Sequence, residues 1–158
     1  MHPMTLIPFE LAGNIYRSAM PFNSGDRDGS LLDAYREFKI EAVVVLTDEL
    51  EARAVTGLDL FYLYRQEGFQ ILNLPVQDYS IPDKALMKQV IGEVIHLAGE
   101  GKNLVVHCHA GIGRTGTFLA CMAKEILKLD GAEAIKWIRK HIPHAVESFA
   151  QIQFVMEY

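Results

Sequence analysis

The sequence predicts an α/β fold, and three observations carry that prediction. Short apolar segments rich in β-branched residues recur at 42–46, 71–74 and 104–107. Helical patterns lie between them, and this alternation of strand and helix is typical of α/β folds. The three segments are apolar almost without interruption, which favours parallel strands buried on both faces. A length of 158 residues suits one domain, so we place no boundary within 1–158.

The first half of the chain contains three helical segments. We expect helices at 31–38, at 50–67 with an interruption at Gly57, and at 84–100. In the third segment, apolar residues fall on one face of a helix, which predicts packing against the sheet. These residues are Leu86, Val90, Val94 and Leu97.

The region after the third strand contains only helical patterns, at 114–129, 131–141 and 149–158. Two of these helices begin with a polar residue followed three positions later by Glu or Gln, the spacing of a capping box. The pairs are Asp130 with Glu133 and Ser148 with Gln151.

Composition and charge narrow the range of partners and locations. The chain has 15 Lys and Arg against 20 Asp and Glu, a net charge of −5, which disfavours binding to nucleic acid or anionic membranes. No apolar run approaches a membrane span, and the N-terminus lacks the charged and apolar regions of a signal peptide. We therefore expect a cytoplasmic monomer without nucleic-acid or membrane partners. Two cysteines are too few for a disulfide framework.

Polar residues follow each of the three predicted strands. Asp48 comes shortly after the first strand, Asp78 after the second and Cys108 directly after the third. In open α/β sheets the site lies beyond the carboxyl ends of the strands. We therefore expect these three residues to lie at one edge of the sheet.

Residues 107–116, HCHAGIGRTG, combine a strand end, a glycine-bearing loop and a helix start. Glycines let successive amides turn inward, and the helix start adds unpaired N–H groups and a positive dipole end. Such a loop suits a dianionic phosphate. The same field favours thiolate over thiol, so we expect Cys108 to be ionised near neutral pH. Arg114 can donate two parallel hydrogen bonds to phosphate oxygens.

Three other interpretations of this loop fit the sequence less well. Gly111, Gly113 and Gly116 fit the dinucleotide pattern G-x-G-x-x-G, but that pattern needs an acidic residue about 20 positions later at a strand end, where only helices follow here. The Walker pattern fails, because Arg114 stands where Lys is required. A structural role for Cys108 as a buried strand end leaves the Gly-Arg-Thr arrangement without a purpose.

The pattern C-x-x-x-x-x-R-T, preceded by His107, resembles the signature loop of the cysteine-dependent protein tyrosine phosphatase superfamily. The loop interior resembles tyrosine-specific members, whereas two further segments resemble small dual-specificity phosphatases. The resemblance implies a mostly parallel sheet of four or five strands flanked by helices on both faces, without a metal or cofactor. The two segments are YRSAMP at 16–21 and Ile-Pro-Asp at 81–83.

The resemblance also implies roles for the residues of the loop. Cys108 attacks phosphorus and forms a phosphocysteine intermediate that water hydrolyses. Arg114 and the loop amides stabilise the oxygens of the transferring group. Thr115 donates to the sulfur or caps the helix, and His107 holds the loop in shape. The phosphate-binding residues are His109, Ala110, Gly111, Ile112, Gly113 and Arg114.

A general acid must protonate the leaving oxygen. Asp48, Asp78 and Asp83 are candidates, but helix capping explains Asp48, and a capping box with Ser80 explains Asp83. Asp78 has no visible capping role, and the resemblance places the acid on its loop, so we predict Asp78 as the acid.

Two further residues, Gln151 and Tyr79, each have a functional and a structural interpretation. Gln151 matches a glutamine of the superfamily that positions the hydrolytic water, but its capping-box spacing is a complete alternative. Tyr79 either stacks on a phosphotyrosine ring or is an ordinary aromatic residue. We expect the side chain of His109 to face solvent.

Neither a disulfide nor a metal site is expected. Cys121 lies about 12 Å down the helix from the loop, beyond the roughly 7 Å Cα limit for a disulfide, and we assign it to the core. The histidines form two pairs that lack further ligands, so we predict no metal. These pairs are His107 with His109 and His141 with His144.

The sequence therefore predicts a metal-independent phosphatase acting on phosphotyrosine in proteins, with phosphoserine and phosphothreonine as possible further substrates. One alternative is an inositol phosphate or phosphoinositide phosphatase, disfavoured because positions 109–113 contain no Lys. Another is a catalytically silent module that binds phosphoproteins, although Cys108, Arg114 and an acid are present. A sulfur-transfer or arsenate-reducing domain leaves Arg114 and Thr115 unexplained.

Overall fold

A computed structural model describes residues 4–158. These residues form one five-stranded sheet with the strand order β1-β2-β5-β3-β4. Strand β1 pairs antiparallel with β2, and all other neighbours are parallel. The predicted α/β class with a mostly parallel sheet is confirmed. The strands are β1 (Met4–Ile7), β2 (Ile15–Ser18), β3 (Ile40–Val45), β4 (Gln70–Asn73) and β5 (Asn103–His107).

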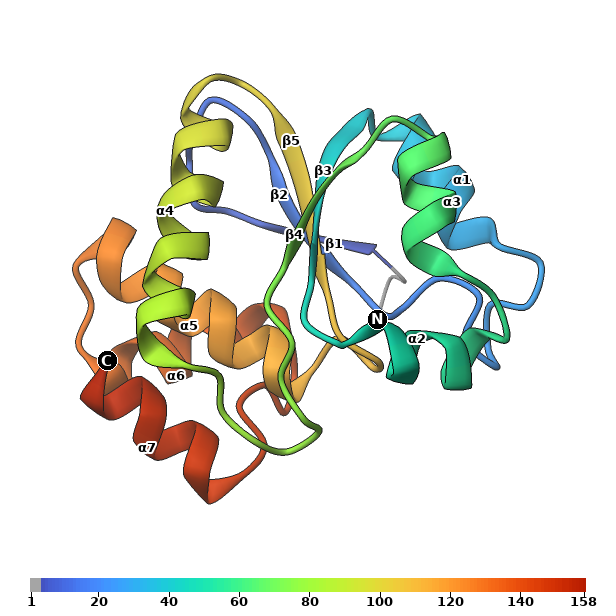
Figure 1. The fold of residues 1–158 in the computed structure, drawn as a ribbon. Coiled ribbons are helices and arrows are strands. Elements are labelled where there is room, and N and C mark those ends of the chain that lie inside the picture. Colours follow the sequence, from blue (N-terminus) through green and yellow to red (C-terminus); the bar gives the residue numbers. More distant parts are fainter. Residues whose placement is uncertain (1–3) are drawn as a thin grey trace.

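Helices cover both faces of the sheet (Figure 1). Helices α1 to α3 pack on one face, and α4 to α7 pack on the other. Alternate β3 residues enter the two cores, because successive side chains of a strand point to opposite faces. The helices are α1 (Ser30–Glu37), α2 (Glu49–Thr56), α3 (Leu60–Gln66), α4 (Lys84–Gly99), α5 (Gly113–Leu127), α6 (Gly131–His141) and α7 (Phe149–Glu157).

Local sequence signals, namely glycines and capping residues, predicted most of the helix boundaries. The expected interruption at Gly57 separates α2 from α3, and this residue ends α2 at a left-handed φ of 72°. Two of the three predicted capping boxes form, at the starts of α6 and α7. The prediction of a capping box between Ser80 and Asp83 was wrong. Asp83 is itself the N-cap of α4 and accepts a hydrogen bond from the backbone of Leu86, so the helix begins later than that spacing requires.

The sequence analysis missed β1 and β2. Each has only four residues, and β2 contains Arg17 and Ser18, so neither shows a continuous apolar run. All four residues of β2 are nevertheless buried, because this strand lies between β1 and β5 and its polar side chains find partners.

The carboxyl ends of β3, β4 and β5 meet at one edge of the sheet, as expected for parallel strands. Val45 of β3 pairs with His107 of β5 and with Asn73 of β4. The segment after β4 continues alongside β3, since the Val76 amide donates to the Leu46 carbonyl. This register brings the segments that follow the three strands together.

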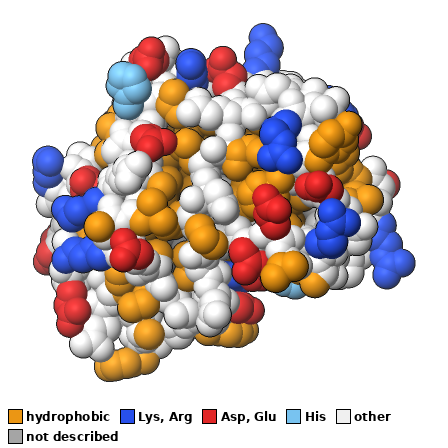
Figure 2. Space-filling model, in the orientation of Figure 1, with side chains coloured by type: hydrophobic (Ala, Val, Ile, Leu, Met, Phe, Trp, Pro, Cys, Tyr) orange, Lys and Arg blue, Asp and Glu red, His pale blue; other side chains and the backbone are white. Residues whose placement is uncertain are grey.

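The charged side chains on the surface do not form a large patch of one sign in the view of Figure 2. Figure 2 shows Lys and Arg interspersed with Asp and Glu over one face of the protein. Among residues 4–158, no helix combines the length and the apolar character needed to cross a membrane.

Candidate active site

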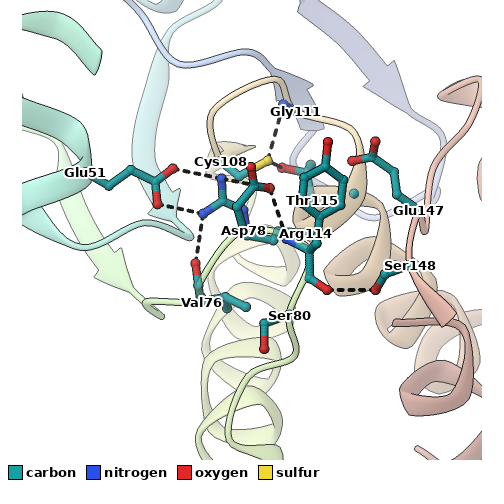
Figure 3. Close-up of polar contacts among 12 residues, drawn as sticks. Glu51, Val76, Asp78, Ser80, Cys108, Gly111, Arg114, Thr115, Glu147 and Ser148 are labelled. Atoms are coloured by element: carbon teal, nitrogen blue, oxygen red, sulfur yellow. Dashed lines mark hydrogen bonds and ion pairs between the residues drawn. The ribbon is translucent and has the colours of Figure 1, made fainter. Parts of the chain in front are cut away.

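The loop between β5 and α5 holds Cys108 above the start of the helix (Figure 3). The Cys108 side chain is buried, and its sulfur accepts two hydrogen bonds. The Gly111 amide donates at 3.3 Å and the Thr115 hydroxyl at 3.2 Å. The contact predicted between Thr115 and the sulfur is therefore present. Both donors stabilise negative charge on sulfur, because hydrogen bonding to a charged form favours that form.

Arg114 lies beside this sulfur and is almost fully buried. Its Nη1 and Nη2 donate to the two carboxylate oxygens of Glu51 at 2.9 and 2.8 Å, and Nη1 also donates to the Val76 carbonyl at 2.8 Å. Burial works to lower the pKa of Arg114, but Glu51, the Cys108 sulfur and Asp78 outweigh it and raise that pKa. The Arg114 Nε is buried and has no hydrogen-bond partner within residues 4–158. A donor in this state suits an anion in the loop.

Glu51 was not among the predicted site residues. It lies in the first turn of α2, 63 positions before Arg114, and only the arrangement of the sheet edge brings the two together. Its position shortly after the end of β3 was the one available signal. The bidentate pair fixes the plane of the guanidinium group, which sets the direction of its remaining donors.

The structure separates the three aspartates considered as general acids. Asp48 and Asp83 are N-caps of α2 and α4 and accept from Glu51 and Leu86 amides. Asp78 lies in the loop after β4, with its Oδ1 3.5 Å from Arg114 Nη2 and its side chain 57% exposed. Asp78 is thus the member of the three that reaches the loop, while its role as acid remains a prediction.

His107 connects the loop to the opposite core. Its Nδ1 lies 2.9 Å from the Cys108 carbonyl and its Nε2 lies 2.8 Å from the Tyr64 hydroxyl. A carbonyl only accepts, so Nδ1 carries the hydrogen and Tyr64 donates to Nε2. Burial lowers the pKa of His107 to about 4, the Cys108 carbonyl opposes this shift, and Arg114 adds to it. A neutral His107 therefore holds the backbone at Cys108, and the sequence had not indicated Tyr64.

Gln151 ties the start of α7 to the loop that carries Asp78. Its Oε1 accepts from the Glu147 and Ser148 amides, and its Nε2 donates to the Ser80 carbonyl at 3.2 Å. The Ser148 hydroxyl donates to the Tyr79 carbonyl at 2.8 Å. The capping role predicted for Gln151 is therefore confirmed. Its role in positioning the hydrolytic water remains a prediction.

The remaining residues singled out in the sequence have clear positions. His109 is exposed, as expected, and Tyr79, next to Asp78 in the chain, is 59% exposed. Cys121 lies in the core, where burial raises the pKa of its thiol to about 12. The part of the chain that the structure describes contains no group of three or more His, Cys, Asp or Glu placed to hold a metal.

Comparison with known proteins identifies this arrangement. Residues 27–126 match the family described as "Polymorphic toxin system, DSP-PTPase phosphatase". The chain belongs to the DSP-PTPase phosphatase family. The match includes the Cys108 loop and Arg114, and the predicted family resemblance is confirmed.

Relatives of this DSP-PTPase phosphatase include the tyrosine-protein phosphatase cdc-14 of Caenorhabditis elegans, 31% identical over 114 residues, which are 72% of this chain and 14% of the relative. The protein tyrosine phosphatase domain-containing protein 1 of Danio rerio is 28% identical over 96 residues, covering 61% of this chain. The matched segment is only 13% of that relative. A crystal structure of Tk-PTP in the active form aligns with a TM-score of 0.80 at 25% identity, covering 99% of this chain and 97% of Tk-PTP.

Proposed function

We propose that the protein hydrolyses phosphotyrosine in proteins, with phosphoserine and phosphothreonine as further substrates, through a phosphocysteine intermediate and without a metal ion. The observation that carries this proposal is the Cys108 sulfur, buried beside Arg114 and hydrogen-bonded to Gly111 and Thr115. A sulfur in this position faces the anion-binding loop, where a phosphate group is presented for in-line attack.

In the first step, the Cys108 thiolate attacks phosphorus, an S–P bond forms and the P–O ester bond breaks. Asp78 in its acid form gives its proton to the leaving oxygen, because an alkoxide or phenolate leaves poorly. Arg114 and the loop amides stabilise the equatorial oxygens of the transferring group. Glu51 supports this by holding the guanidinium plane.

In the second step, water attacks the phosphocysteine, and the Asp78 carboxylate takes its proton. The S–P bond breaks, inorganic phosphate leaves and the thiolate returns. The Thr115 hydroxyl, 3.2 Å from the sulfur, stabilises the departing thiolate. We propose that Gln151 orients the attacking water through its side-chain NH2 group, which donates one hydrogen to the Ser80 carbonyl and has a second one available.

Charges around the loop support a monophosphate ester over a polyphosphorylated substrate. Asp78 is exposed near Arg114, and a Cβ built on Gly113 would lie 2.3 Å from the Glu147 carboxylate, so this carboxylate lies against the start of α5. Figure 3 shows Glu51, Asp78 and Glu147 around the sulfur. Additional phosphates on an inositol ring would be repelled by these carboxylates. The exposed Tyr79 offers an aromatic surface to a phosphotyrosine ring.

The test is hydrolysis of an aryl phosphate by the reduced protein in excess chelator, with Cys108→Ser as the matched control. We expect turnover by the natural sequence and none by the variant. Phosphotyrosine, phosphoserine and phosphothreonine peptides and an inositol polyphosphate are then compared by kcat/KM. No turnover of aryl phosphate, or turnover that survives Cys108→Ser, would overturn the proposal. A higher kcat/KM for the inositol polyphosphate would replace the substrate class.

A further inference from the structure

We propose that Arg17 is a positioning residue, which turns the peptide groups of the phosphate-binding loop so that their N–H groups face the sulfur and the phosphate. This inference rests on the proposed function. Arg17 belongs to β2 and lies within the segment 16–21, to which the mechanism above gives no role. The residue is only 2% exposed, so its guanidinium group acts inside the protein.

Segment 17–20 binds three consecutive carbonyl groups of the loop. Arg17 donates from Nε and Nη2 to the Gly111 carbonyl at 3.0 and 2.8 Å, and from Nη2 to the Ala110 carbonyl at 2.9 Å. The Met20 amide donates to the His109 carbonyl at 2.9 Å. Three successive carbonyls therefore point toward β2 and the residues that follow it.

The geometry of the peptide bond converts these contacts into an orientation of N–H groups. A trans peptide is planar, so the carbonyl of one residue and the N–H of the next point in opposite directions. The described residues include no cis peptide bond. The peptide group between Ala110 and Gly111 shows the result. Arg17 donates to its Ala110 carbonyl on one side, and the Cys108 sulfur accepts its Gly111 N–H on the other. By the same geometry, binding of the Gly111 carbonyl turns the Ile112 N–H away from Arg17.

The loop approaches β2 so closely that only glycine fits at position 111. Gly111 has a φ of 75°, and a Cβ built there would lie 2.2 Å from the Ser18 carbonyl oxygen and 2.5 Å from Arg17 Nη2. This contact leaves no space between the strand and the loop. Arg17 therefore constrains the loop directly.

The charge of Arg17 supports the same function. Burial lowers the pKa of Arg17, whereas interaction with Cys108 and Tyr35 opposes that shift. A buried cation favours a nearby thiolate, since attraction between opposite charges is weakly screened away from water. A planar guanidinium also reaches two carbonyls at once, which the ammonium group of Lys cannot do with the same fixed geometry.

The experiment compares Arg17→Met and Arg17→Lys with the natural protein. Alkylation of Cys108 by iodoacetamide is followed by mass spectrometry as a function of pH, and inorganic phosphate is titrated as a protecting ligand. Both readouts work without turnover. Arg36→Met is the control, because Arg36 is exposed on α1 and pairs with Asp33 and Glu67.

We expect the dissociation constant for phosphate to rise about tenfold in Arg17→Met, and alkylation at pH 6 to slow about tenfold, since a misoriented loop loses donors to both anions. In Arg17→Lys the retained charge should restore most of the alkylation rate but not the phosphate affinity. Arg36→Met should match the natural protein within about twofold in both readouts.

The proposal is overturned if folded Arg17→Met binds phosphate and alkylates as the natural protein does, even when its melting temperature falls. If Arg17→Met does not fold, Arg17→Lys decides, and phosphate affinity equal to that of the natural protein refutes the role. A natural protein that phosphate protects from alkylation, but that does not hydrolyse aryl phosphate, would refute the proposed hydrolysis and leave the Arg17 comparison valid.

Discussion

Glu51→Gln is the substitution that best tests how the site holds its arginine. Glu51 offers one carboxylate oxygen to each terminal nitrogen of Arg114, and its side chain is 27% exposed. Gln keeps one acceptor and replaces the other with an NH2 group that cannot accept. The variant therefore loses one charge-assisted hydrogen bond to a guanidinium group that is 2% exposed.

A hydrogen bond to a charged group contributes about 1.5 to 3 kcal/mol. If the loss falls on the transition state, kcat/KM decreases by roughly 10- to 150-fold, since each 1.4 kcal/mol is a factor of ten. The expected value is near the lower end of this range, because the Val76 carbonyl still holds Nη1 at 2.8 Å.

The assay is steady-state hydrolysis of an aryl phosphate, with inorganic phosphate as a competitive inhibitor. Glu49→Gln is the matched control, since Glu49 is an exposed carboxylate in the same turn of α2 without a contact to Arg114. The control should retain kcat/KM within about twofold. A Glu51→Gln enzyme as active as Glu49→Gln would refute the argument that Glu51 holds Arg114 for phosphate.

Three further predictions follow from the contacts of the site. Asp78→Asn should lower kcat for a poor leaving group by about 100-fold and much less for an activated aryl phosphate; equal losses on both substrates would count against Asp78 as the acid. Gln151→Ala should slow the second step, which rapid-quench kinetics would show as a burst of one phenol per protein. The control, Ser148→Ala, removes the helix cap but keeps the side-chain amide of Gln151, and it should show no burst. A burst in both variants would assign the effect to the helix cap. Protonation of His107 opposes folding, because its pKa is about 4 in the folded protein against about 6.5 in the unfolded chain. The unfolded chain therefore takes up the proton first, and stability falls as the pH drops from about 6.5 to 4. This loss amounts to roughly 3 kcal/mol in chemical denaturation and should be absent from His107→Gln; an equal pH dependence in that variant would contradict it.

The sequence alone determined the features that depend on near neighbours in the chain. Strands β3 and β5 and helix α4 carry apolar patterns long enough to identify them, and the two capping boxes depend on residues three positions apart. The loop from Cys108 to Gly116 was predictable for the same reason. Its cysteine, glycines and arginine lie within nine positions, so sequence order almost fixes their arrangement.

Only the tertiary structure decided what surrounds that loop. Arg17, Glu51 and Tyr64 lie 94, 63 and 43 positions from the groups to which they hydrogen-bond, at Gly111, Arg114 and His107. Contacts at such separations depend on strand order and register, and the short, partly polar β2 gave no apolar signal of its own. The sequence therefore specified the groups that we propose to react. The packing of β2, α2 and α3 around them decided how those groups are oriented, because orientation requires partners that only the folded sheet brings within hydrogen-bond distance.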